Sequence, residues 1–151
     1  MTVIAHTDGA SRGNPGASGI GVILRTPEGT VLGTASGYLG VATNNMAEYT
    51  ALLACLRAAA QLPCDRLIVH TDSELMVRQL TGKYKVRDAR LKKFVVEVRA
   101  ILTGAPYRFE IHHVLREANV DADLLANAGI DGKQPVRVTW TKDAPVQHHV
   151  K

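Results

Sequence analysis

Two short apolar segments of the chain end in the same three residues, histidine, threonine and aspartate. The first segment, residues 3–8, ends at Asp8, and the second, residues 67–72, ends at Asp72. Both are rich in β-branched and aliphatic side chains, which favour strands. If the two strands lie side by side and parallel, their carboxylates meet at one edge of the sheet. We therefore expect residues 3–8 to be the central strand of a mixed sheet, with Asp8 where the strand gives way to the glycine-rich loop 9–16.

Turn residues and hydrophobic periodicity divide the rest of the chain into strands and helices. Residues 19–25 and 30–39 are expected to be strands joined by a turn, so that the first three strands form an antiparallel meander. The elements expected after them are helix 43–61, strand 66–72, helix 73–80, helix 88–102, strand 107–114 and helix 120–131. The last two strands each follow a helical crossover and should lie parallel to the first. The predicted fold class is α/β, a five-stranded mixed sheet flanked by helices.

The chain has 151 residues, which is long enough to bury one hydrophobic core. We expect a single domain over residues 1–131 and a C-terminal tail over residues 132–151, in which residues 136–140 can add an edge strand and the residues from Lys142 on are mobile. No apolar run approaches the ~20 residues of a membrane span, and no signal peptide precedes the first strand. The two cysteines fit neither a disulfide framework nor a zinc site, so free thiols are expected. These features predict a cytoplasmic monomer that does not bind membranes.

The positive charge of the chain is concentrated in one region. The net charge is +4, but residues 78–99 carry eight basic and two acidic side chains, 8 − 2 = +6, which leaves −2 for the rest. A localised basic face indicates a polyanionic partner, although a solvated helix face is the alternative. The glycine-rich loop 9–16 is followed by a strand rather than a helix and lacks the glycine spacing of phosphate-binding loops. We therefore exclude a nucleotide-binding site there.

Two further carboxylates are expected near Asp8 and Asp72. Glu48 lies on the apolar stripe of its predicted helix, where a capping-box role is the alternative, and Asp123 lies in the first turn of the last helix. Carboxylates that converge repel one another by ~4 kcal/mol per close pair at an effective dielectric constant of ~20. Protonation or bound cations must offset this repulsion, and a site made of carboxylate oxygens suits Mg²⁺ or Mn²⁺. Two such ions are the usual means of hydrolysing a phosphodiester.

Four stretches of the sequence, taken together, resemble ribonuclease H, type 1. They are Thr7-Asp8-Gly9-Ala10-Ser11-Arg12-Gly13-Asn14-Pro15-Gly16, Thr43-Asn44-Asn45-Met46-Ala47-Glu48, Thr71-Asp72-Ser73 and Arg116-Glu117-Ala118-Asn119-Val120-Asp121-Ala122-Asp123-Leu124-Leu125-Ala126. With the order of elements, the resemblance covers about residues 2–131. It implies the ribonuclease H-like fold and hydrolysis of the RNA strand of an RNA/DNA hybrid. It also implies two Mg²⁺ ions, for which Mn²⁺ can substitute, and products with a 5′-phosphate and a 3′-hydroxyl.

The resemblance also assigns roles to individual residues. The metal ligands that it implies are Asp8, Glu48, Asp72 and Asp123, and Asp123 fits the family pattern better than Asp121. Contacts with the minor groove of the hybrid, where 2′-hydroxyls distinguish RNA from DNA, are implied for Ser11, Asn14 and Asn45. A pocket for a phosphate of the DNA strand is implied for Thr43 and Asn44. Helix capping is the alternative role of these two residues, and both roles can hold at once.

The sequence departs from the family pattern in three places. One is the pair His6 and His70, which stand two residues before each aspartate where members usually have apolar residues; we expect satisfied or partly buried histidines, with a zinc site as the alternative. Many members have a histidine in the loop after the fifth strand, whereas this loop, residues 115–118, has none. We hypothesise that Arg116 partly substitutes as a catalytic residue, and that His112 and His113, inside the strand, are structural. The long basic handle of some members is also absent, because residues 83–87 form only a short linker. Hybrid affinity should then depend on the basic residues 78–99 and be sensitive to salt.

Two other functions stay open at this point. An enzyme with the same fold and metals could cut double-stranded RNA or another nucleic acid. A hybrid-binding module without catalysis is the second alternative, and the presence of all four carboxylates argues against it.

Overall fold

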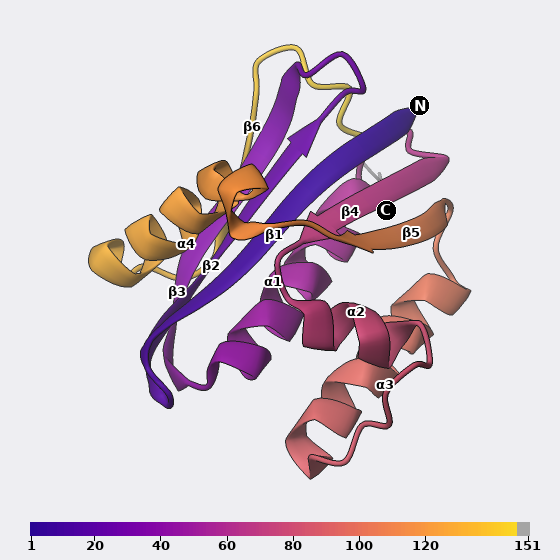
Figure 1. Ribbon diagram of the computed structural model, residues 1–151. Helices are drawn as coiled ribbons and strands as arrows, with labels where there is room; N and C mark the ends of the chain where they lie inside the picture. The colour runs from indigo at the N-terminus through magenta and orange to yellow at the C-terminus, as the bar shows by residue number, and fades with distance from the viewer. Residues whose placement is uncertain (148–151) are drawn as a thin grey trace, which may run out of the picture.

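The structure, a computed structural model, describes residues 1–147. Its elements are β1 (Thr2–Gly13), β2 (Gly16–Arg25), β3 (Val31–Ala42), α1 (Asn44–Ala59), β4 (Arg66–Thr71), α2 (Glu74–Leu80), α3 (Ala89–Thr103), β5 (Arg108–His113), the short 3₁₀ turn η1 (Arg116–Ala118), α4 (Val120–Gly132) and β6 (Arg137–Trp140). The strands form one mixed sheet in the order β5-β4-β1-β2-β3-β6, with β1 near its centre (Figure 1). None of the helices in this part of the chain combines the length and the apolar composition that crossing a bilayer requires.

The register of β1 confirms the expected pairing of the two strands that end in Thr-Asp. β1 is parallel to β4, with His6 opposite His70 and Thr7 opposite Thr71. β1 is antiparallel to β2, β2 is antiparallel to β3, and β4 is parallel to β5. The predicted α/β sheet with its antiparallel meander is therefore confirmed, and Asp8 and Asp72 both follow threonines that are direct neighbours in the ladder.

Two expectations about the sheet are wrong. First, β1 does not end at Asp8 but runs to Gly13, so Asp8 lies within the strand, opposite Gly21. The pairing with β2 continues to Gly13 and Gly16, and the left-handed backbone at Gly13 (φ 108°) closes the hairpin. Second, within residues 1–147 the sheet has six strands rather than five, because the optional edge strand forms as β6 and pairs antiparallel with β3. The segment expected to be a glycine-rich loop is thus mostly hairpin.

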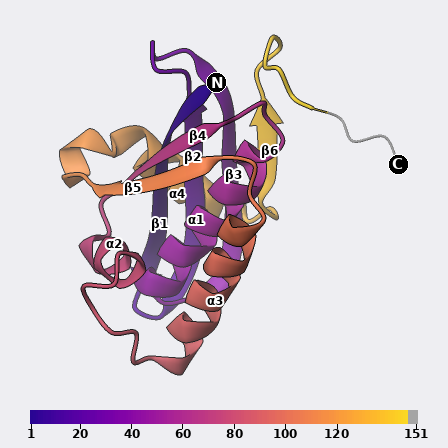
Figure 2. The same cartoon turned by 90° about the vertical axis from the view of Figure 1, so that its right-hand side faces the viewer.

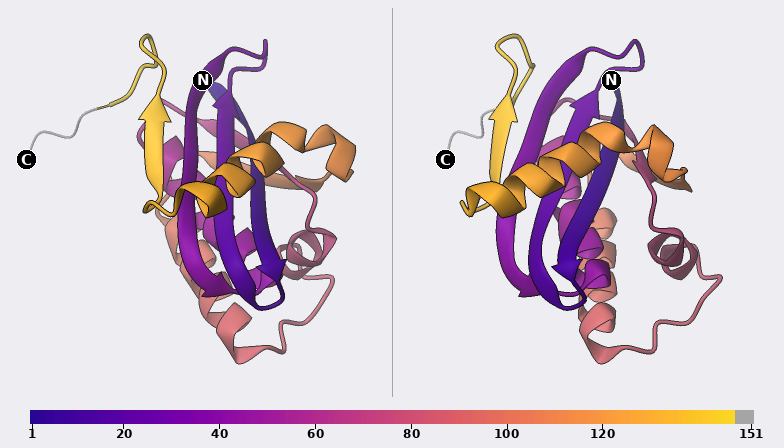
Figure 3. Two further views of the ribbon diagram at one scale, coloured as in Figure 1. Left: turned by 90° about the vertical axis from the view of Figure 1, so that its left-hand side faces the viewer. Right: turned by 60° about the vertical axis from the view of Figure 1, so that its left-hand side comes forward.

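The helices cover the two faces of the sheet unequally. α1 and α3 pack together on one face, and α4 alone crosses the other face over β1, β2 and β3 (Figures 2 and 3). The main core lies between α1 and the sheet, where Leu52 and Leu56 are fully buried. Burial of a leucine side chain contributes about 1.5–3 kcal/mol. Two buried hydroxyls in this core are satisfied, since Tyr49 donates to Gln79 Oε1 at 2.7 Å and Tyr107 donates to the Leu56 carbonyl at 2.8 Å.

Glycines let a helix on each face approach the sheet closely. A Cβ atom on Gly9 of β1 would lie 2.2 Å from the carbonyl carbon of Ala47 in α1. A Cβ atom on Gly21 of β2 would lie 2.1 Å from the carbonyl oxygen of Ala122 in α4. Real side chains do not tolerate such distances to backbone atoms. The two glycines therefore set how near α1 and α4 lie to β1 and β2.

The C-terminal segment runs along the β3 edge of the sheet. After β6, the Thr141 amide donates to the Leu32 carbonyl at 2.9 Å, Val146 packs against the core, and the Gln147 amide donates to the Gln61 carbonyl at 2.6 Å. Residues 142–147, expected to be mobile, thus have defined contacts here, and residues 148–151 of the predicted mobile end lie outside the described part. The division into a domain that ends at residue 131 and a tail stays a prediction.

Candidate active site

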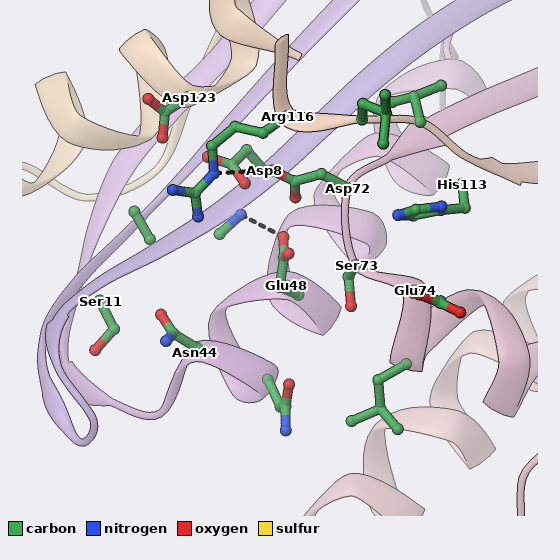
Figure 4. Close-up of a pocket in the computed structure, with 16 residues that line it drawn as sticks. Asp8, Ser11, Asn44, Glu48, Asp72, Ser73, Glu74, His113, Arg116 and Asp123 are labelled. Carbon is green, nitrogen blue, oxygen red and sulfur yellow. Dashed lines mark hydrogen bonds and ion pairs between the residues drawn. The ribbon is translucent and has the colours of Figure 1, made fainter. Parts of the chain in front are cut away.

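Three carboxylates from separate elements meet at one point. Asp8 comes from β1, Asp72 follows β4, and Glu48 comes from α1 (Figure 4). Among the residues that the structure describes, these three each place a carboxylate oxygen within 4.8 Å of the other two. They line a pocket of about 510 Å³. Asp8 and Glu48 are only 4% and 8% exposed, so this is a buried concentration of negative charge open to solvent on one side.

Glu48 is held by the backbone of β1. Its Oε1 accepts a hydrogen bond from the Gly9 amide at 2.6 Å. The helix N-cap is Thr43, whose hydroxyl oxygen accepts from the Met46 amide at 3.2 Å. A capping-box carboxylate occupies the third helical position, which is Met46, and Glu48 lies two residues further on. The capping-box alternative for Glu48 is therefore wrong.

The proximity of these groups makes them hard to ionise. Burial, followed by the charges of Glu48, Asp72 and Asp123, raises the pKa of Asp8 to about 9. Burial and the charge of Asp72 raise the pKa of Glu48 to about 8, against the opposing hydrogen bond from Gly9. Near neutral pH the metal-free site therefore retains protons that a bound cation would displace. Carboxylate oxygens that share so much unfavourable charge fit a hard divalent cation.

Asp123 lines the same pocket but stands apart from the group of three. It lies in the first turn of α4, and its Oδ1 accepts from Asn127 Nδ2 at 3.3 Å. Its neighbour Asp121 instead pairs with Arg25 at 2.6 Å and lines a different cavity. The structure thus brings three of the four predicted ligands together, and Asp123, which Figure 4 shows beside Asp8, lies near enough to contribute to the raised pKa of Asp8.

A buried amide fixes the start of α4. Asn119 is 1% exposed, and its Nδ2 donates to the Thr7 carbonyl at 2.9 Å. This bond ties the residue before α4 to β1 directly beside Asp8. The sequence signals Asn119 only as a polar residue at a helix start, and its cross-link to β1 depends on the packing of α4 against the sheet.

The guanidinium group of Arg116 lies over the carboxylates (Figure 4). Its Nε is 3.9 Å from Asp72 Oδ2, and its side chain is 86% exposed. An exposed cation at this distance adds little to stability. It can instead contact an anion that enters the pocket.

The predicted substrate-binding residues occupy two adjoining cavities. Ser11, Asn44 and Asn45 line the carboxylate pocket, while Asn14, Thr43 and Asn45 line a neighbouring cavity of about 360 Å³. The Asn44 amide donates to Asn14 Oδ1 at 3.1 Å, and the Ser11 hydroxyl donates to the Ala42 carbonyl at 2.9 Å. These bonds hold the β1–β2 hairpin against the start of α1. Of the two possible caps, Thr43 takes that role.

Sequence reasoning missed part of the pocket wall. Ser73, Glu74 and His113 line it beside Asp72. His113, expected to be structural, is exposed at the end of β5, opposite Thr71 in the ladder. The register of β5 with β4 is the signal that places His113 here, and that register cannot be read from the sequence of β5 alone.

Comparison with known proteins places the chain in a family. A family model described as reverse transcriptase-like matches residues 6–129. Ribonuclease HI of Halobacterium salinarum is 43% identical over 129 residues, which are 85% of this chain and 64% of that protein. Ribonuclease H of Bordetella bronchiseptica is 36% identical over 138 residues, which cover 83% of this chain and 86% of that protein. The chain belongs to the ribonuclease H family, type 1.

A solved ribonuclease H has the same fold. The crystal structure of LC11-RNase H1 in complex with an RNA/DNA hybrid has a TM-score of 0.82 and 39% identity, and it covers 86% of this chain and 97% of that one. The family match contains all four carboxylates of this ribonuclease H, whereas β6 lies outside it. The chain spans just under two thirds of the H. salinarum protein, 64% of its length.

Proposed function

We propose that this ribonuclease H hydrolyses the RNA strand of RNA/DNA hybrids with two Mg²⁺ ions, leaving a 5′-phosphate and a 3′-hydroxyl. The observation that carries the proposal is the set of three carboxylate oxygens within 4.8 Å of one another in an open pocket. The relative that was solved with a bound RNA/DNA hybrid supports this substrate. Mn²⁺ can take the place of Mg²⁺ at oxygen ligands of this kind.

Asp8, Glu48 and Asp72 would hold the ions, and Asp123 would complete the ligand set from α4. When bound, a pair of divalent ions activates water and stabilises the leaving oxygen of a phosphodiester. The protein contributes fixed positions, because the Gly9 amide orients Glu48 and Asn119 ties α4 to β1. Ligands held in this way need little rearrangement when the substrate arrives.

Arg116 would contact the scissile phosphate or the leaving group. Its exposure and its 3.9 Å separation from Asp72 leave the guanidinium group free to donate to an incoming oxyanion. Replacement of Arg116 by alanine should lower turnover of hybrid. An unchanged turnover rate in Arg116→Ala would remove this role.

The polar residues on the α1 side would read the hybrid. Ser11, Asn14 and Asn45 would contact the minor groove, where ribose 2′-hydroxyls lie. Thr43 and Asn44 would bind a phosphate of the DNA strand at the start of α1, where backbone amides favour anions. The Thr43 hydroxyl caps α1 through its oxygen, which leaves its own hydrogen available to donate to a phosphate.

The proposal is tested with three substrates of one sequence. The protein is incubated with labelled RNA/DNA hybrid, double-stranded RNA and double-stranded DNA, each with Mg²⁺ and with chelator. We expect only the RNA strand of the hybrid to be cut, and only with metal. Cleavage of double-stranded RNA at a similar rate would favour the broader nuclease, and metal-independent binding without cleavage would favour a binding module.

The carboxylates are tested by an isosteric change. Asp72→Asn should lower the cleavage rate on the order of 10³-fold or more, because it removes a ligand of the proposed ions. Circular dichroism should confirm that the variant folds. A folded Asp72→Asn protein that cuts hybrid at the wild-type rate would contradict the proposed mechanism.

We also propose that the protein is a monomer of the cytoplasm. The free thiols support the compartment only, since Cys55 and Cys64 are both buried and unbridged, as suits a reducing environment. Light scattering coupled to size exclusion tests the monomer. Fractionation of cells that express the tagged protein tests the compartment.

A further inference from the structure

A second groove opens from the carboxylate pocket between α2 and β5. Its volume is about 320 Å³, and it shares Glu74 and His113 with the carboxylate pocket. The other side chains that line it are those of Val77, Arg78, Thr81, Lys83, Ile111 and His112. We call this cavity the α2–β5 groove. Because Glu74 and His113 line both cavities, the groove adjoins the carboxylate pocket.

The lining of the α2–β5 groove has more cations than anions. Arg78 and Lys83 contribute two cations, and His112 and His113 contribute imidazole groups, against the single carboxylate of Glu74. Both imidazoles are exposed, so their N–H groups can reach a ligand. A groove with two cations and two additional donors fits successive phosphate groups of a nucleic-acid backbone.

The basic side chains of the groove are arranged by the protein itself. The amides of Lys83 and Tyr84 both donate to the Arg78 carbonyl, at 2.8 and 3.1 Å, so the chain after α2 folds back beside Arg78. The Arg78 guanidinium group lies 5.3 Å from the centre of the Tyr84 ring, and its Nε is 2.8 Å from Glu74 Oε1. These contacts fix the Arg78 side chain and bring the backbone of Lys83 beside Arg78 before any ligand binds.

The α2–β5 groove leaves the pocket on the side away from the hybrid-reading residues. In Figure 4, Glu74 and His113 lie on one side of the carboxylates, and Ser11 and Asn44 lie on the other. A strand whose scissile phosphate sits at the carboxylates has to continue in both directions along the surface. The α1 side offers amide and hydroxyl groups, whereas the α2–β5 side offers cations.

We propose that the α2–β5 groove binds the phosphates of the cut strand next to the scissile linkage, with Arg78 and Lys83 as the phosphate ligands. This inference rests on the proposed function and adds a binding subsite to it. The groove holds the RNA strand on one side of the cut and so increases affinity for substrates that extend in that direction. His112 and His113 donate hydrogen bonds to the same backbone.

Charge removal tests the groove against matched controls. Arg78→Ala and Lys83→Ala remove one cation each from the groove, while Arg137→Ala and Lys142→Ala remove one each from exposed positions at or just beyond β6, at the opposite edge of the sheet. We expect each groove variant to raise KM for hybrid roughly 3- to 10-fold, to leave kcat within about twofold, and to reduce the slope of log affinity against log salt by about 1. The controls should keep the wild-type KM. Groove variants that match the controls would overturn the proposal.

Replacing single phosphates of the hybrid by neutral linkages shows which strand the groove binds, and on which side of the cut. Methylphosphonates replace single phosphates of the RNA strand at each of the positions flanking the cut. In the wild-type protein, neutral linkages on one side only should weaken binding, and in the Arg78→Ala/Lys83→Ala variant the same linkages should have no further effect. If the neutral linkages weaken hybrid binding by the variant as much as by the wild type, the groove does not hold the cut strand. The same conclusion follows if only neutral linkages in the DNA strand weaken binding.

Binding measured with chelator separates this inference from the proposed function. If the wild type binds hybrid in chelator but does not cut it in Mg²⁺, the proposed activity is contradicted. Weaker binding by the groove variants in chelator would still support the groove. If the wild type cuts hybrid in Mg²⁺ but the groove variants bind it as tightly as the controls do, only the groove proposal is contradicted. Circular dichroism of each variant shows whether a loss of affinity reflects unfolding.

Discussion

At the scale of single residues, the main chain of Gly9 does two things for the site. Its amide donates to Glu48, and its lack of a Cβ lets the Ala47–Glu48 backbone lie against β1. Both effects act on the same carboxylate. The position of Glu48 is therefore set by backbone atoms of two elements rather than by packing of its own side chain.

The first prediction concerns this contact. Gly9→Ala would put a methyl group 2.2 Å from a backbone carbon of α1, so α1 must move away from β1. We expect the free energy of unfolding to fall by roughly 2–4 kcal/mol and cleavage to fall on the order of 10²-fold, because the ligand set is displaced. Chemical denaturation and initial rates measure the two effects. Gly104→Ala, where a Cβ meets nothing within 4 Å, is the control and should change stability by less than about 0.5 kcal/mol.

The second prediction concerns pH and Mg²⁺. The pKa values of Asp8 and Glu48 are about 9 and about 8 in the folded metal-free protein, against 3.8 and 4.5 as ordinary values. Between about pH 4.5 and pH 8 the folded state therefore binds more protons than the unfolded state, so its free energy of unfolding falls as pH rises. Mg²⁺ should then raise Tm more at about pH 8, by roughly 3–8 °C, than at about pH 6.

Calorimetric scans at both pH values, with and without Mg²⁺, measure this difference. Asp8→Asn replaces a carboxyl group that the folded metal-free protein keeps protonated at about pH 8 with an amide that needs no proton. It should raise the Tm of the metal-free protein at about pH 8 and reduce the shift that Mg²⁺ produces. If Mg²⁺ raises the Tm of the wild type equally at the two pH values, proton release by these carboxylates is not linked to Mg²⁺ binding.

At the scale of elements, the site depends on how α4 is fastened to the sheet. Gly21 permits close contact with Ala122, and Asn119 bonds to the Thr7 carbonyl. Asp123 follows one residue after that contact. The angle of α4 across the sheet thus decides how far Asp123 stands from the other three carboxylates.

The third prediction tests that fastening. Asn119→Ala removes the bond to Thr7 and leaves a buried carbonyl without this donor, which should cost roughly 1–3 kcal/mol of stability. We expect kcat to fall roughly tenfold while KM changes little, since Asp123 moves whereas the residues proposed to contact the hybrid, Ser11, Asn14 and Asn45, do not. Asp121→Asn, which breaks only a partly exposed ion pair with Arg25, should change stability by less than about 1 kcal/mol. A variant of Asn119 with wild-type kcat would show that α4 is positioned by other contacts.

At the scale of the whole molecule, binding should be governed by charge. Residues 78–99 carry a net +6, as counted from eight basic and two acidic side chains, on a chain whose net charge is +4. The fourth prediction is that the Kd for hybrid rises roughly 10- to 100-fold between about 50 and 200 mM salt, as for a few phosphate contacts. Fluorescence anisotropy in chelator measures it. A Kd that does not change with salt would mean that the basic region faces solvent only.

Much of the fold follows from local sequence patterns. The matching His-Thr-Asp ends indicate two carboxylates side by side because β1 and β4 pair in parallel with these ends opposite each other, and the caps Thr43, Ser73 and Asp88 mark helix starts. The length of β1 could not be predicted, since its glycines extend only because β2 pairs with them. The place of His113 depends in the same way on a partner strand distant in sequence.

The contacts at Gly9 and Gly21 also have a practical consequence. Since main-chain atoms fix α1 and α4 against the sheet, exposed residues far from the pocket can be replaced without moving the carboxylates. A handle loop inserted after Lys85, or a second domain fused beyond β6, should leave the geometry of the carboxylates intact. This compact nuclease is therefore a suitable scaffold to which different substrate-binding domains can be attached.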